Sequence, residues 1–531
     1  MNADAQLRND RLIETLADIL GKDAVITDAE ERRFYSADVY VSGEQCAAAI
    51  RPKDAAALGR AVAAITKAGY AVIGRGGGMS YTKGYIPVRA DTVTVDVGAL
   101  NRIVEINESD MYITVEAGVT WKQIYDALKP KGLRLPFFGT FSGIKATVGG
   151  GLSQGALFMG TARYGQGADI VLGLEVVLAD GTVVRTGQGA FKNVTKPFYR
   201  TYGPDLTGLF LHDSGAFGIK TRATLKLIRA PKYLDYVSFA FAGIENASKA
   251  LSEIARAQIA EEAYIFDPES TDKNLASASI KEDLKTLTGV VTGQSSLFKG
   301  LTEGAKLILA GRSFAKEGKF SLHMVAAGRA EAAVAHDMAA AREIAARFGG
   351  EEIPNSIPKA VRADPFKPLN SVLGPHGDRW AAMNAKVAHS DAMKIIAAGD
   401  ALLARHADKM KAHGITVSRL FIAIDSYAFS YEPVLHWDDE WLPVHRRTAE
   451  PAHLKQFKEP AANPAGRAVV EEIRVAFATL FAELGASSNQ IGKSYPYLDS
   501  LSPETRKLVM GLKSLLDPGA TLNPGALGFG K

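Results

Sequence analysis

Residues 71–84 read AVIGRGGGMSYTKG, an apolar run that ends in three consecutive glycines. Residues without side chains let successive backbone N–H groups approach an anion such as a phosphate. The two commonest phosphate motifs do not fit this spacing. Counted from Gly74, the third glycine of G-x-G-x-x-G falls on Met79, and no register supplies G-x-x-x-x-G-K-[ST]. Taken alone, the stretch predicts either a tight turn or an anion site of another kind.

Length and composition restrict the class of protein. A chain of 531 residues is too long for one hydrophobic core and predicts two or three domains. With 62 Lys and Arg against 58 Asp and Glu, the net charge of +4 gives no support to nucleic acid as a partner. The single cysteine, Cys46, rules out an internal disulfide and a cysteine-rich metal cluster. The first residues lack a signal-peptide pattern and no run of about 18 apolar residues occurs, so we expect a cytoplasmic protein without a membrane span.

Strand-like and helix-like segments alternate over the first 230 residues. Residues 47–52 and 70–76 predict strands that flank a helix over 54–69, and the second strand runs into the glycine stretch. Two β-rich runs joined by Asp180–Gly181 predict a hairpin, because this dipeptide favours a type I′ turn. Residues 218–231 predict a further strand pair.

The pattern changes after Pro231. Strand patterns at 233–243, 318–328 and 415–430 alternate with Ala-rich helical tracts. This β-α-β-β-α-β rhythm predicts an inserted α+β domain with an antiparallel sheet and helices on one face, in the manner of ferredoxin-like folds. The Pro- and charge-rich residues 436–466 predict a loop. The predicted division of the chain is 1–232 for the first domain, 233–470 for the inserted domain and 471–531 for a C-terminal segment that returns to the first domain.

Two more glycine clusters follow the first. They read KATVGGGLSQG at 145–155 and GPDLTGLFLHDSGAFGIKTRATLKL at 203–227, and each is set between predicted strands. Backbone that approaches a ligand closely at several points suits a long ligand. The three clusters therefore favour a dinucleotide over a mononucleotide.

The motifs GRGGGMSYTKG, VEAGVTW, ATVGGG, RYG, LEVVLADGTVVRTG, GPDLTGLF, GAFGIKT and DPGATLNPG occur in one order along the chain. In this succession the sequence resembles the FAD-linked oxidases of the vanillyl-alcohol oxidase/p-cresol methylhydroxylase superfamily. The resemblance covers residues 40–230 and the last forty residues. It implies an α+β fold, in which a two-part FAD-binding domain of the p-cresol methylhydroxylase (PCMH) type carries an α+β cap domain over the substrate.

The resemblance also implies which residues hold FAD, mostly through main-chain groups. The first cluster is expected around the pyrophosphate, the second against the diphosphate and ribose, and the Tyr-Gly pair near the flavin ring. The implied cofactor-binding residues are Arg75, Gly76, Gly77, Gly78, Met79, Ser80, Tyr81, Thr147, Val148, Gly149, Gly150, Ser153, Gly155, Tyr164, Gly165, Gly218 and Ile219.

Departures from the family pattern concern the attachment of FAD. Members that attach FAD covalently in the first loop carry His where this chain has Met79, and others use a His from the cap, whose matching strand here offers none. Where one branch has an Asp after Tyr-Gly that supports flavinylation, this chain has Gln166. We therefore predict that FAD is bound non-covalently.

Other departures concern the substrate. Asn489 stands where the D-2-hydroxyacid branch has a metal-binding His, so no metal site is predicted. The phenol-oxidising branch has a Tyr-Arg pair at the position of Ile491–Gly492, and Lys493 and Tyr495 follow just after it. The predicted catalytic residues are Tyr495 as a phenol donor, Lys493 as a cation and Gln166 at the flavin edge. In the cap, Arg379, Trp380, His376 and His389 are further candidates for the substrate face, although a structural role is the default for each.

The leading hypothesis is an FAD-dependent oxidoreductase that oxidises an aromatic, phenolic or otherwise bulky alcohol by hydride transfer to flavin N5. One alternative is a D-2-hydroxyacid dehydrogenase of the lactate or glycolate type, and another is a flavin-binding electron-transfer subunit without its own substrate. The electron acceptor stays open between O2, a quinone and an electron-transfer protein. By analogy with the superfamily, we expect a homo-oligomer such as a dimer.

Overall fold

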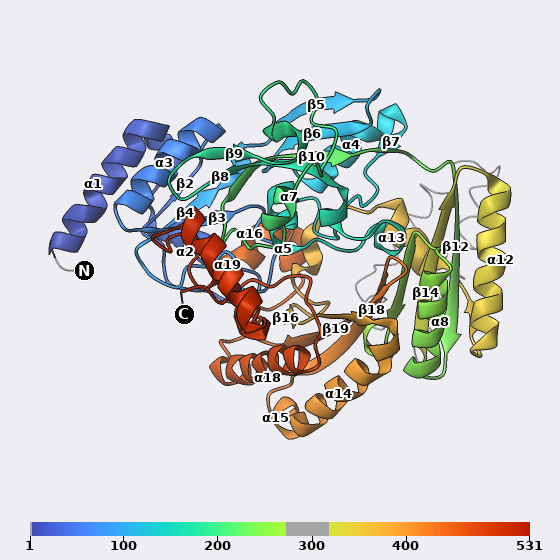
Figure 1. Ribbon diagram of the computed structural model, residues 1–531. Coiled ribbons are helices and arrows are strands. Elements are labelled where there is room, and N and C mark those ends of the chain that lie inside the picture. The colour runs from blue at the N-terminus through green and yellow to red at the C-terminus, as the bar shows by residue number, and fades with distance from the viewer. Residues whose placement is uncertain (1–2, 272–317, 531) are drawn as a thin grey trace.

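The computed structural model describes residues 3–271 and 318–530. Figure 1 shows two parts: the blue to green N-terminal strands and helices, and a large sheet with its helices below and to the right of them. The C-terminus lies close to the N-terminal part. Across the described residues, no helix has the length and apolar character needed to cross a lipid bilayer.

The first sheet carries the glycine stretch at one end. Its strand order is β1 (Val25–Ile26), β2 (Ala48–Ile50), β4 (Thr92–Asp96) and β3 (Ala71–Arg75), and β4 runs parallel to both β2 and β3. Helix α3 (Ala55–Lys67), capped by the side chain of Asp54, makes the crossover between β2 and β3. Ligands of such sheets bind beyond the carboxyl ends of parallel strands, where the glycines stand.

The second sheet of the N-terminal part is antiparallel. Its order is β5 (Ile103–Asn107), β6 (Tyr112–Glu116), β10 (Ile219–Lys226), β8 (Val171–Val177) and β9 (Val183–Arg185). The hairpin predicted at Asp180–Gly181 is confirmed, with Gly181 at φ +84° between β8 and β9. The strand pair predicted for 218–231 is wrong. Strand β10 pairs with β6 and β8, whereas β11 (Ile228–Arg229) pairs with β7 (Leu133–Arg134), because non-local partners are available to both strands.

The third sheet, called here the cap sheet, is large and antiparallel, as predicted. Its order is β15 (Glu351–Ile353), β12 (Tyr233–Phe241), β14 (Phe320–Gly328), β13 (Glu262–Phe266), β18 (Thr416–Ile424), β19 (Ala428–Trp437) and β16 (Arg379–Ala382), and β17 (Ala385–Ala388) also pairs with β19. Its helices are α8 (Ile244–Arg256), α12 (Glu331–Arg347), α14 (Ala392–Arg405) and α18 (Pro464–Glu483).

Side chains of the cap sheet alternate between two cores. Phe421, Phe429 and Tyr431 are buried together with the side chains of the covering helices. Tyr264 and Ile422, which are paired across β13 and β18, belong instead to the core of the N-terminal part. The ring of Tyr264 lies 5.5 Å from that of Phe158. One face of the cap sheet therefore packs on helices and the other on the N-terminal part.

The C-terminal residues complete the first sheet. Helix α18 spans the predicted boundary at residue 470 and packs in the core of the cap sheet. Farther on, the N–H of Asn523 donates to the carbonyl of Val72 on β3, and Val72 forms a bridge with Leu522. The chain end is thus tied beside the strand that leads into the glycine stretch.

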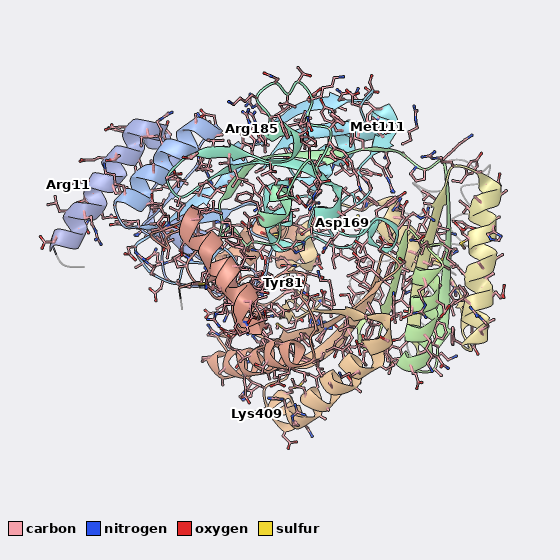
Figure 2. All side chains as sticks on the ribbon, viewed as in Figure 1. Arg11, Tyr81, Met111, Asp169, Arg185 and Lys409 are labelled. Carbon is pink, nitrogen blue, oxygen red and sulfur yellow. The ribbon has the colours of Figure 1, made fainter. Side chains whose placement is uncertain are left out.

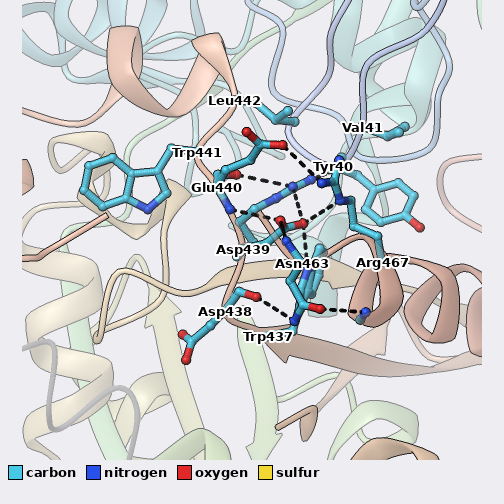
Figure 3. Close-up of polar contacts among 12 residues, drawn as sticks. Tyr40, Val41, Trp437, Asp438, Asp439, Glu440, Trp441, Leu442, Asn463 and Arg467 are labelled. Atoms are coloured by element: carbon cyan, nitrogen blue, oxygen red, sulfur yellow. Dashed lines mark hydrogen bonds and ion pairs between the residues drawn. The ribbon is translucent and has the colours of Figure 1, made fainter. Parts of the chain in front are cut away.

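Residues 436–466, predicted as a loop, contain the helices α16 (Pro443–Thr448) and α17 (Pro451–Leu454) and a buried charge cluster (Figure 3). The carboxylate of Asp439 accepts a hydrogen bond of 2.8 Å from Arg379 and lies 3.0 Å from Nε of Arg467. It also accepts from the N–H of Asn463 at 2.8 Å. Arg379 donates in addition to the carbonyl of Tyr40. Arg379, a candidate for the substrate face, is therefore part of a buried ion pair that joins this segment to the N-terminal part.

Candidate active site

The loop after β3, residues 76–80, is called here the glycine cradle. Within the described parts of the chain, the N–H groups of residues 77–81 donate no hydrogen bond. Gly78 adopts φ +71°, which turns the backbone and is accessible to glycine at little cost. A row of unpaired N–H groups in a turn is the geometry that binds an anion.

Close backbone packing explains why the cradle consists of glycines. A Cβ at Gly77 would lie 1.9 Å from the carbonyl oxygen of Lys145, and one at Gly76 would lie 2.2 Å from Oγ1 of Thr147. Neither position can therefore carry a side chain without displacing the second glycine cluster. The two clusters, some seventy residues apart in the sequence, are in direct contact.

A cavity of about 580 Å³ opens beside the cradle. The volume lies within the range typical of cofactor sites. Its wall includes Gly76, Gly77 and Thr147 from the two glycine clusters and the side chains of Lys122 and Lys145. Asp96 and Asp126 also line the cavity, and Asp126 pairs with Lys122. The glycine backbone, Lys145 and the volume fit the diphosphate part of a dinucleotide such as FAD.

Arg75 does not line this cavity. Its guanidinium group donates to the carbonyls of Phe34 (3.1 Å) and Ala37 (2.8 Å) and stacks over the ring of Phe34. A Cβ at Gly78 would lie 2.6 Å from Nη2 of Arg75. The side chain of Arg75 therefore supports the cradle from behind.

The second glycine cluster starts the helix α5 (Val148–Gln154). The N–H groups of Val148 and Gly149 donate to the carbonyls of Val119 and Ala117, both at 2.8 Å, and Thr147 caps the N–H of Gly150. These donors are used within the protein. Of the four residues predicted here against the diphosphate and ribose, only Thr147 lines the cavity, while the glycines allow close packing of the helix.

Several predicted cofactor residues serve packing. A Cβ at Gly218 would lie 2.4 Å from Val176, and Ile219 packs beneath Gly74 of β3. The ring of Tyr164 lies beside the guanidinium group of Arg134, and Gly165 takes φ +72° just after it. Their positions fix the strands and turns around the cradle.

A second group of polar side chains, called here the polar junction, lies where β17 of the cap sheet meets the N-terminal part. Lys386 of β17 donates a hydrogen bond of 3.3 Å to Oε1 of Gln166. Burial lowers the pKa of Lys386 to about 8, and no carboxylate of the described residues forms an ion pair with it. Gln166, predicted at the flavin edge, is thus next to a half-buried cation.

His212 and Asn489 extend the polar junction. Nδ1 of His212 contacts the carbonyl of Asn489 at 3.3 Å, while Nε2 is buried without a hydrogen-bond partner. Burial lowers the pKa of His212 to about 4, so the ring is neutral at pH 7. Both residues pack against Gly155, where an added Cβ would lie 2.1 Å from the carbonyl oxygen of Asn489. The carbonyl of Ser153 accepts the N–H of Ser214 nearby.

Tyr81 lies between the N-terminal part and the cap sheet, in the middle of the molecule (Figure 2). Its ring packs edge-on against Trp380 at 5.3 Å, and its hydroxyl accepts a hydrogen bond of 3.3 Å from Gln490. Gln490 also accepts a hydrogen bond of 2.8 Å from Ser80. Met79 packs in the same apolar cluster as Trp380. The end of the cradle is thus fixed to the C-terminal segment and to the cap.

The predicted catalytic residues Tyr495 and Lys493 point to different places. The hydroxyl of Tyr495 accepts the N–H of Asn384 at 2.7 Å, next to the cap sheet. Nζ of Lys493 donates at 2.6 Å to the carbonyl of Ile86, behind the cradle. Burial lowers the pKa of Lys493 to about 7. The structure therefore places Tyr495 with Tyr81, whereas Lys493 supports the loop that follows the cradle.

Four polar residues of the site were not predicted from the sequence: Lys386, His212, Gln490 and Glu432. Glu432 lies on β19 between Tyr431 and Pro433 and makes no hydrogen bond or ion pair within the described residues. A single carboxylate in an otherwise apolar strand was the available signal. Among the described residues, no group of three or more His, Cys, Asp and Glu side chains is arranged to hold a metal ion.

Comparisons with known proteins agree with this geometry. Residues 46–187 match the FAD binding domain family. The glycolate oxidase subunit GlcD of Bacillus subtilis is 31% identical over 212 residues, which is 40% of this chain and 43% of that protein. The mitochondrial D-lactate dehydrogenase [cytochrome] 1 of Saccharomyces cerevisiae is 32% identical over 185 residues, 34% of this chain and 30% of that protein. The chain thus spans less than half the length of these curated relatives.

A solved structure matches the whole chain. The crystal structure of p-cresol methylhydroxylase with substrate bound superposes with a TM-score of 0.75 at 19% identity, over 99% of this chain and 97% of that chain. At this identity the match shows the fold. Residues 46–187 therefore match the FAD binding domain family, and the chain has the fold of p-cresol methylhydroxylase.

Proposed function

We propose that this chain is an FAD-dependent oxidase or dehydrogenase that oxidises the CH–OH group of a small molecule, with a phenolic or other bulky alcohol as the preferred substrate class. The observation that supports this most is the glycine cradle, which has a row of unpaired N–H groups and whose Gly76 and Gly77 line a cavity within the region that matches the FAD binding domain family. Bound FAD supplies the oxidising power by accepting a hydride from the substrate carbon.

The residues of this chain hold and orient the reactants. The cradle and Thr147 hold the diphosphate, and Gln166 with Lys386 offers hydrogen-bond donors where the cap sheet meets the N-terminal part. Tyr81, Trp380 and the neighbouring cap residues exclude water from the same region.

FAD is bound non-covalently in this proposal. In the cradle, the side chain nearest the implied attachment position is the thioether of Met79, which packs in an apolar cluster. On β19, the side chains of Ser430, Glu432 and Val434 point to the face of the sheet that packs on the N-terminal part. None of these positions carries a histidine or tyrosine for attachment; His436, farther along the same face of β19, contacts Ser418 and Asp378 instead. Acid precipitation of the purified protein tests this point: flavin that stays in the supernatant supports it, and a yellow pellet contradicts it.

A second candidate is the oxidation of a D-2-hydroxy acid. It is favoured by the similarity to glycolate oxidase and D-lactate dehydrogenase and by Lys386, a half-buried cation without a carboxylate partner that suits a substrate carboxylate. A third candidate, an electron-transfer subunit, would be reduced only with a partner protein present.

Anaerobic mixing of the protein with benzylic alcohols, 4-alkylphenols and D-2-hydroxy acids separates these candidates. The proposal predicts that alcohols or alkylphenols bleach the flavin absorbance; bleaching by hydroxy acids alone selects the second candidate. If no compound bleaches the flavin without an added protein, the third candidate replaces both. Reoxidation in air then distinguishes an oxidase from a dehydrogenase. We also propose a homo-oligomer, which analytical ultracentrifugation tests.

A further inference from the structure

Three polar positions of the cap sheet face the N-terminal part side by side. The register pairs Lys386 of β17 with Ser430 of β19, so both side chains leave the sheet on one face. Glu432 lies two residues from Ser430 on the same face, and its cross-strand partner on β18 is Leu420, which packs on the core of the N-terminal part. Polar groups on this face therefore point at the candidate active site and away from the helices.

Two of these polar groups lack a partner. The hydroxyl of Ser430 is buried without a hydrogen bond, and within the described residues no hydrogen bond or ion pair reaches the carboxylate of Glu432. The Glu432 side chain is part-buried, and a carboxylate partly withdrawn from water without a donor or cation is costly, so such groups are rare unless a ligand uses them. Glu432 is thus a hydrogen-bond acceptor for which the protein itself supplies no donor.

Several elements contribute titratable or charged groups around Glu432. The charge of Glu432 acts on the hydroxyls of Tyr81, from the end of the cradle, and Tyr495, from the C-terminal segment. The charge of Arg474 of α18 also acts on both tyrosines, but its guanidinium group donates to the carbonyls of Ala382 and Tyr81. Lys386, on the same sheet face, donates to Gln166. No cation of the described residues therefore neutralises Glu432.

Burial raises the pKa of the Glu432 carboxyl to about 7. An acid–base group works best when its pKa lies near the working pH, because both protonation states are then populated. Glu432 thus combines a carboxylate without a protein donor, close enough to act on Tyr81 and Tyr495, with a proton affinity suited to acid–base chemistry.

We propose that Glu432 is a catalytic residue that accepts the hydroxyl proton of the substrate. The inference rests on the function proposed above. In the step, the substrate O–H bond breaks and the proton bonds to a carboxylate oxygen of Glu432. The electron pair of that bond completes the C=O bond, while the substrate carbon gives its hydride to FAD. Water later removes the proton from the neutral carboxyl group.

The experiment compares the FAD-loaded wild type with Glu432→Gln, Glu432→Asp and the control Glu352→Gln. Glu352 lies on β15 of the same sheet, pairs with Arg342 and is half-exposed, so its variant removes one carboxylate far from the site. With a compound that bleaches the flavin, the wild-type reduction rate rises through an inflection near pH 7. Glu432→Gln lowers the rate at pH 8 by about 100-fold or more and removes the inflection, Glu432→Asp restores part of it, and the control leaves both unchanged.

Binding of phenol, followed by the perturbation of the flavin absorbance, provides a readout that does not depend on turnover. The wild-type dissociation constant should change with pH around 7, and the change should be absent in Glu432→Gln. Unaltered rates and pH profiles in Glu432→Gln, or wild-type binding of phenol that is absent or independent of pH, would overturn the assignment. Lack of bleaching by every compound in the wild type, with pH-dependent phenol binding retained, would instead refute the proposed oxidation and leave Glu432 as the residue that recognises the hydroxyl.

Discussion

Arg134 donates two parallel hydrogen bonds of 2.7 Å each to the two carboxylate oxygens of Glu261. Arg134 belongs to β7 of the N-terminal part and Glu261 precedes β13 of the cap sheet, and both side chains are almost fully buried. Arg362 contacts the same carboxylate at 2.6 Å. This ion cluster fixes the cap sheet against the part that binds FAD.

Replacing Glu261 by Gln should destabilise the protein by about 3–5 kcal/mol, because the buried guanidinium group of Arg134 would lose its countercharge and Arg362 would keep only Glu262. The Glu261 carboxylate should also make the free energy of unfolding depend on pH in the acid range. Burial alone would raise the pKa of Glu261, but the charges of Arg362 and Arg134 hold this pKa down to about 2, below its usual value of 4.5. A depressed carboxyl pKa contributes stability that is present above pH 4.5 and is lost as the pH falls towards 2. Urea unfolding of the wild type and Glu261→Gln between pH 7 and 3 measures this contribution. A constant difference across that range would show that the carboxylate is not stabilised by its partners.

The cradle predicts a specific loss of cofactor. Gly77→Ala places a methyl group 1.9 Å from the carbonyl of Lys145, so the loop must move and its N–H groups lose their common direction. The purified variant should contain little FAD and bind added FAD at least tenfold more weakly. Gly511→Ala is the matched control, since Gly511 lies in helix α19 (Pro503–Leu516) with no atom within 4 Å of the added Cβ. Normal flavin content in Gly77→Ala would refute the role of the cradle.

The cluster around Asp439 predicts a structural effect of the segment 436–466. Asp439→Asn leaves Arg379 without a countercharge and leaves Arg467 only Glu440, and we expect a loss of about 3 kcal/mol in unfolding free energy. Asp438→Asn, at the exposed neighbouring position, should change stability by less than about 0.5 kcal/mol. Denaturant unfolding of both variants measures the contrast. Equal stabilities would mean that the buried pairs contribute nothing.

Glu432 predicts the opposite pH dependence to that of Glu261. Its pKa is raised from 4.5 to about 7 on folding, so stability present below pH 4.5 is lost as the pH rises through 7. The charged carboxylate costs about 3 kcal/mol above pH 7, from the shift of the pKa. Glu432→Gln should therefore be more stable than the wild type at pH 8, and the difference should shrink towards pH 5. A pH-independent difference in unfolding free energy between the two proteins would show that the pKa of Glu432 is not raised on folding.

The main-chain part of the site could be predicted from the sequence because glycine motifs record close backbone approaches directly. The contact of Gly76 and Gly77 with residues 145–147 leaves no room for side chains, so the steric requirement is visible in the sequence as glycines. Arg75 shows the limit of this reasoning. Its position beside the cradle was predictable, but the direction of its side chain depends on the carbonyls of Phe34 and Ala37, which no local pattern reveals.

The side-chain part of the site could not be predicted, because it is assembled by strand register and by segments far apart in the chain. Lys386 reaches Gln166 only because β17 pairs with β19 at the edge of the cap sheet. Lys493 and Tyr495 are two residues apart in the sequence, yet one supports the loop after the cradle and the other faces the cap. The turn between them decides which side chain can meet a substrate.

An anaerobic absorbance trace of the purified, FAD-loaded protein tests most directly whether this chain oxidises a hydroxyl-bearing small molecule through FAD held at the cradle. We predict that an alcohol or alkylphenol bleaches the flavin band without any added protein, and that Gly77→Ala, which retains little FAD, shows no such change. A wild-type flavin band that stays oxidised with every alcohol, alkylphenol and hydroxy acid would contradict the proposed activity.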